Sequence, residues 1–221
     1  MSLLIHGARK LDAHGEVDSF WMLCEGDSIV ATGHGSPPVV ERVETEIVDA
    51  SGAWLVPGFV DLHGHGGSGH SFDDGPAAIA AALAVHRAHG TTRSIISLVA
   101  NPIDELCESL AGIADLAEVD PLVLGSHLEG PFLAPARRGA HNLEHLLEPE
   151  PYEVERLIGA ARGTLRQITL APELPGAFEA IDVLVEAGVV VAIGHTEADF
   201  EVTRAAFDRG ARLITHAFNA M

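Results

Sequence analysis

The sequence predicts an α/β fold with a parallel sheet, preceded by a small β-rich part, and two observations carry this prediction. From residue 56 onward, short and continuously apolar segments alternate with longer Ala-rich segments of helical character. Continuously apolar strands are typical of a parallel sheet covered on both faces, with helices as the connections. Residues 1–55 differ, because Gly, Asp and Pro separate their short apolar stretches, as in strands joined by tight turns. We therefore expect a β-unit at residues 1–55 and an α/β unit at residues 56–221.

Six strands and five helices are expected in the second part. The strands are predicted at residues 55–62, 92–99, 122–128, 167–170, 189–193 and 212–215. The helices are predicted at residues 76–89, 103–117, 150–161, 176–187 and 199–209. Six repeats of this kind fit either an open sheet or a (β/α)8 barrel that lacks its last two units. The sequence ends at Met221 directly after a predicted strand, so we expect a truncated chain.

The chain is strongly acidic, with 13 Lys and Arg against 32 Asp and Glu and a net charge of −19. Clustered basic residues drive binding to nucleic acid and anionic membranes, so neither is expected as a partner. No apolar run approaches the roughly 18 residues of a membrane span, and the N-terminus lacks the apolar core of a signal peptide. Cys24 and Cys107 lack CxxC spacing, which predicts two free thiols in the reducing cytoplasm.

Polar residues follow four of the predicted strands at their carboxyl ends, where barrel active sites lie. His63 and His65 stand two apart on an extended segment, so both imidazoles project from one face. Glu129, His195 and His216 end three further strands. An H-x-H pair alone occurs by chance, and a single strand-end histidine is often structural. Their joint occurrence favours a barrel rim that binds Zn²⁺ or Fe²⁺, since imidazole and carboxylate are the ligands expected for these ions.

The lysine content narrows the kind of metal site. Some binuclear hydrolases of this fold bridge their metals with a carbamylated lysine from a barrel strand, but the only lysine here is Lys10 in the β-unit. Glu129 is therefore the natural shared carboxylate. His127 lies on the same strand face as Glu129 by the period of two, which leaves open a supporting role beside the metal ligands.

Several specific segments carry a resemblance to a known family. They are VPGFVDLHGHG at 56–66, HLEGPF at 127–132, RGAHN at 138–142, TLAPE at 169–173, GHT at 194–196 and THAFNAM at 215–221. In these segments the chain resembles the N-acetylglucosamine-6-phosphate deacetylases of the amidohydrolase superfamily. The match runs from the β-unit to the last residue.

The resemblance implies a fold, a metal site and a substrate site. The fold is a TIM-like (β/α)8 metal-dependent hydrolase barrel, incomplete here, with a small β-sandwich built from both chain ends, and the protein is expected to be a homodimer. Glu129, His195 and His216 would bind the principal metal, and His63 with His65 would make this the two-metal type, with Zn or Fe as one or two ions per chain. The expected substrate contacts are Ala140, His141, Asn219 and Ala220. The general acid/base of the family is an aspartate of the eighth strand, which we expect beyond Met221, so no catalytic acid/base is assigned within 1–221.

The implied reaction is hydrolysis of the acetamide of N-acetylglucosamine 6-phosphate to glucosamine 6-phosphate and acetate. His141 is a candidate for holding the substrate or stabilising an oxyanion, although a surface-loop histidine is the alternative. Two other functions stay open. One is a different amidohydrolase that acts on an N-acyl amino acid or a cyclic amide, and the other is an inactive metal-binding fragment that lacks the closing strands.

Overall fold

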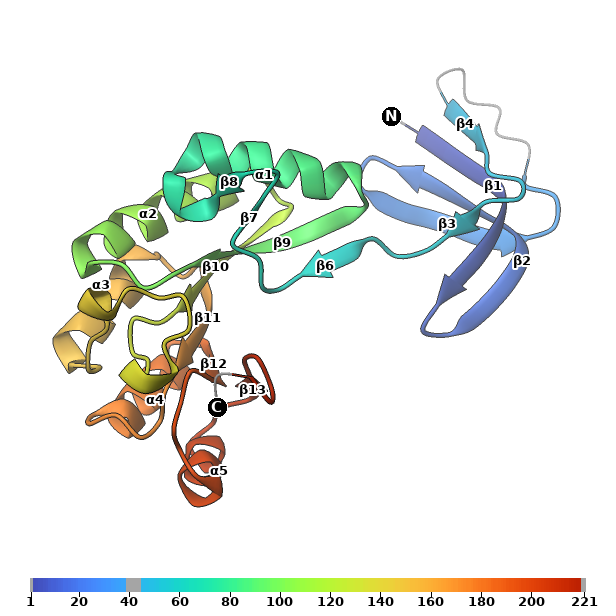
Figure 1. The fold of residues 1–221 in the computed structure, drawn as a ribbon. Coiled ribbons are helices and arrows are strands. Elements are labelled where there is room, and N and C mark those ends of the chain that lie inside the picture. The colour runs from blue at the N-terminus through green and yellow to red at the C-terminus, as the bar shows by residue number, and fades with distance from the viewer. Residues whose placement is uncertain (1, 39–44, 220–221) are drawn as a thin grey trace. The chain divides into compact units, whose positions relative to one another are not determined.

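The computed structural model describes residues 2–38 and 45–219 and divides the chain into two compact units, Met1–Gly58 and Phe59–Met221. Figure 1 shows the elements of both units. Sequence analysis placed a domain boundary between residues 55 and 56, and that domain assignment stays a prediction. Within the described residues, no helix is both long enough and apolar enough to cross a membrane.

The N-terminal unit is a five-stranded sheet in its described part. Its strands are β1 (Ser2–Asp12), β2 (Gly15–Glu25), β3 (Ser28–His34), β4 (Thr45–Asp49) and β5 (Trp54–Leu55). The order is β3-β2-β1-β4, with β5 also pairing β1. β1, β2 and β3 form antiparallel hairpins, and the second turn uses Gly26 at a φ of +62°, which only glycine adopts without strain. β4 and β5 pair with β1 in parallel. The sequence predicted a small β-sandwich part here, and in residues 2–38 and 45–58 the structure shows this one five-stranded sheet.

The C-terminal unit is built on a six-stranded parallel sheet whose strands follow chain order, β13-β12-β11-β10-β9-β6. The strands are β6 (Phe59–Asp61), β9 (Thr91–Leu98), β10 (Val123–Glu129), β11 (Leu165–Leu170), β12 (Val190–Ile193) and β13 (Leu213–Ile214). The five α-helices of the described residues are α1 (Pro76–Ala88), α2 (Ile103–Val119), α3 (Pro151–Ala160), α4 (Ala177–Glu186) and α5 (Phe200–Asp208). Six strands with five intervening helices confirm the predicted barrel-type α/β fold, incomplete at six strands.

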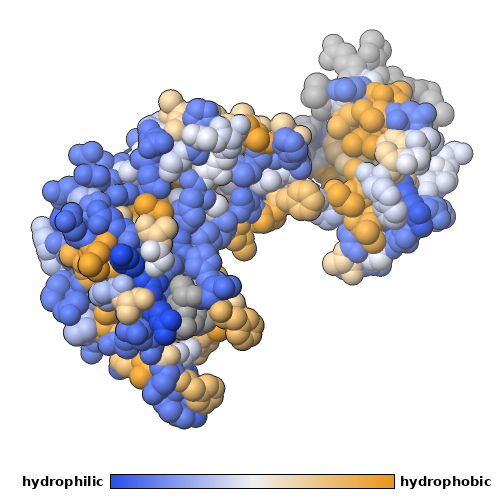
Figure 2. Space-filling view, viewed as in Figure 1, coloured by the Kyte–Doolittle hydropathy of each residue, from blue (hydrophilic) through white to orange (hydrophobic). Residues whose placement is uncertain are grey.

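The helices lie along one side of the curved sheet (Figure 1), and the main core fills the space between them. Leu110 of α2, Leu128 of β10 and Ile168 of β11 are completely buried there. The helix surface that faces the viewer in Figure 2 is mostly hydrophilic, as amphipathic helices on the outside of a sheet require. Pro76 begins α1 and Gly90 follows the helix with a φ of +96°, the usual positions of proline and glycine at helix ends.

The predicted strand at residues 55–62 is wrong as a single element. Trp54 and Leu55 form β5 in the N-terminal sheet, whereas Phe59–Asp61 form β6 beside β9. Pro57 between them has no backbone N–H to donate to a strand partner, and Gly58 is conformationally permissive, so the ladder is interrupted at this point. The first barrel strand is therefore short, and it ends just before the H-x-H pair.

Short elements follow the strands at their carboxyl ends. β7 (Gly66–Gly67) and β8 (His70–Ser71) form a small antiparallel pair after β6, and the 3-10 helix η1 (Phe72–Asp74) precedes α1. After β10 the chain forms two more 3-10 helices, η2 (Pro135–Arg137) and η3 (Leu143–His145). Phe132, Leu133 and Ala134 are buried at the start of this connection, so it is packed against the end of the sheet.

Candidate metal centre

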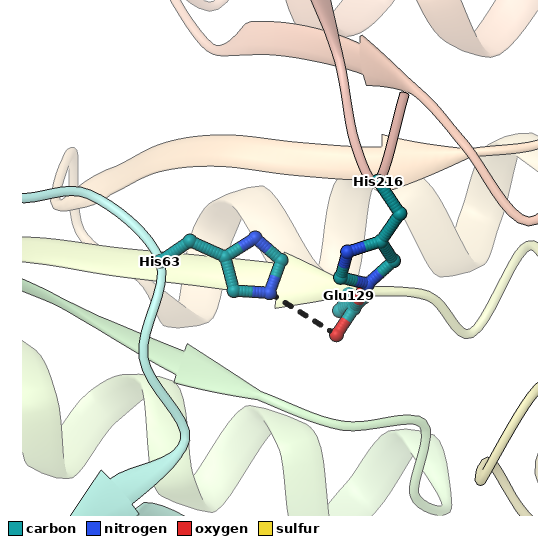
Figure 3. Close-up of side chains that lie close together, drawn as sticks. All are labelled: His63, Glu129 and His216. Carbon is teal, nitrogen blue, oxygen red and sulfur yellow. Dashed lines mark hydrogen bonds and ion pairs between the residues drawn. The ribbon is translucent and has the colours of Figure 1, made fainter. Parts of the chain in front are cut away.

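Glu129 is the centre of the cluster predicted from the sequence. It ends β10, and it is 3% exposed. Its Oε2 lies 2.7 Å from Nε2 of His65 and 3.3 Å from Nε2 of His63. Its Oε1 lies 2.9 Å from Nε2 of His195 and 2.6 Å from Nε2 of His216. All five residues predicted as metal ligands thus meet at one carboxylate, and Figure 3 shows His63 and His216 approaching it from different segments.

The turn after β6 brings the first two histidines to this point. Asp61 accepts a hydrogen bond from the backbone N–H of His63 at 3.2 Å, and the Nε2 atoms of His63 and His65 lie 3.1 Å apart. Gly66 has a φ of +140°, and a Cβ atom there would lie only 2.0 Å from the carbonyl oxygen of His70. Glycine is therefore required for β7 to approach β8 directly behind the H-x-H pair.

His195 and His216 both adopt left-handed backbone conformations, with φ of +51° and +52°. Such a conformation is uncommon for a residue with a side chain and costs of order 1 kcal/mol or more. It turns the chain sharply at the end of β12 and of β13. Nδ1 of His195 also lies 2.8 Å from the carbonyl oxygen of Arg137, to which it can only donate, so Nε2 is the ring nitrogen that faces Glu129.

The electrostatics of the cluster follow from burial and from these contacts. Burial disfavours the charged form of Glu129, but hydrogen bonds from His195, His63 and His65 outweigh it and hold its pKa well below the usual range. Burial also disfavours protonated His195, yet its bonds to Glu129 and to the Arg137 carbonyl raise its pKa. The cluster therefore keeps a carboxylate, which is the form that binds metal ions.

Two buried histidines beside the cluster are held neutral. Burial lowers the pKa of His127 to about 3 and that of His141 to about 4. Nδ1 of His141 accepts a hydrogen bond from the backbone N–H of Ala100 at 3.2 Å, so the proton of the neutral ring is on Nε2. That Nε2 lies 3.8 Å from Oε2 of Glu129. His141 is thus placed at the cluster and not on a surface loop.

The donor set fits a divalent metal ion. Two overlapping groups have ligand atoms within 4.8 Å of one another, namely His63, Glu129, His216 and Glu129, His141, His195. The closest contacts instead divide the histidines by carboxylate oxygen, with His63 and His65 on one and His195 and His216 on the other. His141 is the weakest ligand candidate of the five histidines, because its Nδ1 accepts from Ala100 and its Nε2 lies 3.8 Å from Oε2 of Glu129, the longest of these distances.

A cavity of about 650 Å³ opens over the cluster. Of the predicted substrate contacts, Ala140 and His141 line it. Asn219 is exposed and does not line it, and Ala220 lies outside the described residues. Their substrate-binding roles stay predictions.

Sequence reasoning missed three polar residues in the cavity wall, Asn101, Asn142 and His145. Asn101 follows β9, which lies between β6 and β10 in the sheet. Unlike those two strands, β9 has no histidine or carboxylate at its carboxyl end. The amide of Asn101 donates to the partly buried carboxylate of Asp73 at 3.2 Å. Its position in the sequence could have identified Asn101, because it lies just after a barrel strand in the same way that Glu129 lies at the end of one.

A parallel sheet with carboxylate and imidazole ligands gathered at its carboxyl rim defines the class of metal-dependent barrel enzymes. The sequence profile of one such family, described as the amidohydrolase family, matches residues 54–221. The chain therefore belongs to the amidohydrolase family.

Individual relatives agree with the resemblance seen in the sequence. The N-acetylgalactosamine-6-phosphate deacetylase of Escherichia coli is 33% identical over 225 residues, which cover 100% of this chain and 58% of that protein. The crystal structure of N-acetyl-D-glucosamine-6-phosphate deacetylase from Mycobacterium smegmatis is 41% identical with a TM-score of 0.89, covering 99% of this chain and 57% of that one. A mutant of that enzyme in complex with N-acetyl-D-glucosamine-6-phosphate matches with a TM-score of 0.89 and 41% identity, over 100% of this chain and 56% of that one. The chain spans a little over half the length of these relatives.

Proposed function

We propose that this chain carries the metal-binding part of a deacetylase that hydrolyses the acetamide of N-acetylglucosamine 6-phosphate to glucosamine 6-phosphate and acetate, a step of amino-sugar catabolism. The single observation that carries the proposal is the placement of Glu129 within 3.3 Å of four histidine Nε2 atoms, under a cavity lined by residues 139–142. The similarity to deacetylases of hexosamine 6-phosphates supports the substrate class.

The metal ligands in this proposal are His63, His65, Glu129, His195 and His216, and the metal is Zn or Fe. Two ions per chain are favoured, because the two oxygens of Glu129 face different pairs of histidines. A divalent ion bound here would lower the pKa of a bound water molecule to about 7 and would polarise a carbonyl oxygen.

His141 is proposed to orient the acetamide group. Its Nε2–H is fixed as a donor because Nδ1 accepts from Ala100, and its low pKa keeps this tautomer neutral. A donor held in a buried position costs no reorganisation when negative charge develops on the carbonyl oxygen. Ala140 is proposed to contact the substrate from the same wall, and Asn219 and Ala220 are kept as expected contacts from the chain beyond β13.

The proton carried from water to the departing amine needs a positioned acid/base group. In the described part of the chain, the cavity wall holds no aspartate. The earlier expectation of an aspartate beyond Met221 is kept as part of this proposal, as are a homodimer and a cytoplasmic location. The latter is supported by the two cysteines, Cys24 and Cys107, which are both free.

A second substrate is favoured by one observation, the 33% identity to an N-acetylgalactosamine-6-phosphate deacetylase. N-Acetylgalactosamine 6-phosphate differs in the orientation of one ring hydroxyl, and the acetamide chemistry is the same. The cavity of about 650 Å³ is large enough for either sugar.

The test is acetate release by the full-length protein loaded with Zn²⁺ or Fe²⁺ and supplied with N-acetylglucosamine 6-phosphate, N-acetylgalactosamine 6-phosphate or an N-acetylated amino acid. We expect turnover of N-acetylglucosamine 6-phosphate. The ratio of its kcat/KM to that of N-acetylgalactosamine 6-phosphate then shows which sugar the enzyme prefers. Turnover of the N-acetylated amino acid alone would move the protein to another amidohydrolase function. Metal binding by residues 1–221 alone, with no turnover of any of them, would support the inactive metal-binding alternative.

A further inference from the structure

Buried side chains link four strands of the C-terminal sheet through hydrogen bonds close to Glu129. His127 of β10 stands at the centre and is completely buried. Its Nδ1 lies 2.9 Å from Oγ of Ser97 on β9, and its Nε2 lies 2.9 Å from Oγ1 of Thr169 on β11. Oγ1 of Thr169 lies 2.8 Å from Oγ1 of Thr215, directly after β13. We call Ser97, His127, Thr169 and Thr215 the hydroxyl–imidazole chain.

The last contact of the hydroxyl–imidazole chain, between Thr169 and Thr215, spans the intervening strand β12. Thr169 and Thr215 come from β11 and β13, and β12 lies between these strands in the sheet. Gly194, directly after β12, leaves the space open. A Cβ atom on Gly194 would lie 2.8 Å from Cβ of Thr215 and 3.1 Å from Cγ2 of Thr169. The glycine of the GHT segment is therefore required by the contact between the two threonines.

The first end of the chain reaches the H-x-H pair. Oγ of Ser97 accepts a hydrogen bond at 3.2 Å from the backbone N–H of Gly64, the residue between the two histidines. The ring of His127 also packs edge-on against the ring of His63, with centroids 4.7 Å apart and planes at 68°. His127 thus contacts one predicted metal ligand, His63. Through Ser97 it also fixes the backbone segment that carries His63 and His65.

The other end of the chain reaches the last predicted ligand. Thr215 is 5% exposed, and it immediately precedes His216, whose backbone is in the left-handed conformation. The anchored threonine therefore sets the point from which the chain turns to direct His216 at Glu129. The hydroxyl–imidazole chain joins the two outermost strands of the site without contributing a ligand of its own.

Two assignments of protons satisfy every link, and in both the Gly64 N–H donates to Ser97. In one, the Ser97 hydroxyl donates to Nδ1 of His127, Nε2–H donates to Thr169, and the Thr169 hydroxyl donates to Thr215. In the other, these three hydrogen bonds run in the opposite direction, from Thr215 to Ser97. Buried hydrogen-bond chains of this kind are stiff, because losing one member leaves its neighbours without partners.

We propose that His127 is a positioning residue, which through the hydroxyl–imidazole chain sets the spacing between the H-x-H segment, Glu129 and His216 that a metal ion requires. This inference rests on the proposed metal site and extends it to residues that touch neither metal nor substrate. It predicts that these residues control metal affinity beyond their effect on stability.

The experiment measures Zn²⁺ affinity of the full-length protein by competition with a chromogenic chelator. His127→Phe keeps a ring of similar size and removes both hydrogen bonds, and we expect Zn²⁺ affinity to fall about 10- to 100-fold, the range seen when partners of metal ligands are changed. His127→Asn keeps an amide near the Nδ1 position and His127→Gln keeps one near the Nε2 position. Each restores one half of the chain, so intermediate affinities are expected.

Two serines on neighbouring strands give a matched pair. Ser97 and Ser126 are both completely buried, but Ser126 Oγ donates only to the carbonyl oxygen of Thr164 at 3.4 Å and lies outside the hydroxyl–imidazole chain. Ser97→Ala and Ser126→Ala should lower the melting temperature of the metal-free protein by similar amounts. Only Ser97→Ala should weaken Zn²⁺ binding.

Thr169→Val covers the case in which the His127 variants do not fold, because it keeps the shape of the side chain and removes only the hydroxyl. Zn²⁺ affinity that follows melting temperature equally in all variants, Ser126→Ala included, would overturn the inference and leave the metal site intact. If the unaltered protein binds no Zn²⁺ or Fe²⁺, the proposed function fails, and that outcome is distinguishable from failure of the positioning role.

Discussion

The two compact units of the chain use their charged and polar side chains in opposite ways. In Met1–Gly58, Lys10 pairs with Asp12 two residues away, and Arg9 pairs with Glu16 on the adjacent strand. In Phe59–Met221, Glu129 is contacted by His65 and His216, which are 64 and 87 residues away in the sequence. The first pattern stabilises a hairpin locally. The second costs chain entropy and burial of a charge, so it points to function in the second unit.

The physical consequence is a difference in sensitivity to mutation. Exposed ion pairs contribute little to stability, because water already solvates both partners. A buried carboxylate depends on its partners, and a change on either side leaves an unpaired polar group.

The largest effect is expected at Glu129, whose two carboxylate oxygens contact both pairs of histidines. Glu129→Ala should abolish metal retention at the principal site, and His195→Ala and His216→Ala should do the same. Metal content after gel filtration, measured by mass spectrometry, checks this. Glu153→Ala is the matched control, since Glu153 pairs with Arg156 at 3.1 Å on the outside of α3 and should leave metal content unchanged. Full metal content in Glu129→Ala would refute the ligand assignment.

The next largest effect is expected at His141, where substitution should lower the rate of turnover without changing the metal content. His141→Ala should keep bound metal and lower kcat by about 100- to 1,000-fold, the usual loss when one preorganised donor to a developing oxyanion is removed. Steady-state kinetics with N-acetylglucosamine 6-phosphate, alongside the metal content of the same sample, separates the two. Loss of metal in this variant would instead place His141 among the ligands, as one of the two close groups around Glu129 allows.

A partial loss is expected at the H-x-H pair. Replacing both His63 and His65 by Ala should remove one of two metal equivalents and leave the other on Glu129, His195 and His216. This follows because the two pairs of histidines face different oxygens of Glu129. Titration of the metal-free variant with Zn²⁺ gives the stoichiometry, and an unchanged value would show that the two-metal assignment is wrong.

The convergence of the four histidines on Glu129 could be predicted from the sequence, because the carboxyl ends of the strands can be located there. His195 follows a continuously apolar strand, and parallel strands carry their carboxyl ends to one rim, so the histidines and Glu129 had to converge if the barrel pattern held. The positioning of each side chain was not predictable. The left-handed backbone at His195 and His216 is uncommon for residues other than glycine, and no local pattern announces it.

Other features depended on contacts that span the fold. Pro57 is visible in the sequence as a residue that interrupts a strand, yet the apolar residues on both sides of it resembled one continuous strand. Asn101 and His145 reach the cavity only because their connections fold over the rim, and η3 carries His145 there. Composition and periodicity report which face of an element is buried, but they do not report where a connection leads.

The smallest effect is expected in the N-terminal unit, at Lys10. Nζ of Lys10 lies 2.8 Å from Asp12, and this hydrogen bond lowers the pKa of Asp12 below its ordinary value of 3.8. An acid with a depressed pKa stabilises the fold above its ordinary pKa, and this contribution is lost as pH falls through the folded-state value. Lys10→Ala should therefore lower the melting temperature slightly at neutral pH, and the difference from the unaltered protein should vanish in acid. Its metal content should not change, because Glu129, and not a carbamylated lysine, is the shared ligand in the proposed metal site. A loss of metal in Lys10→Ala would break the contrast between the two units.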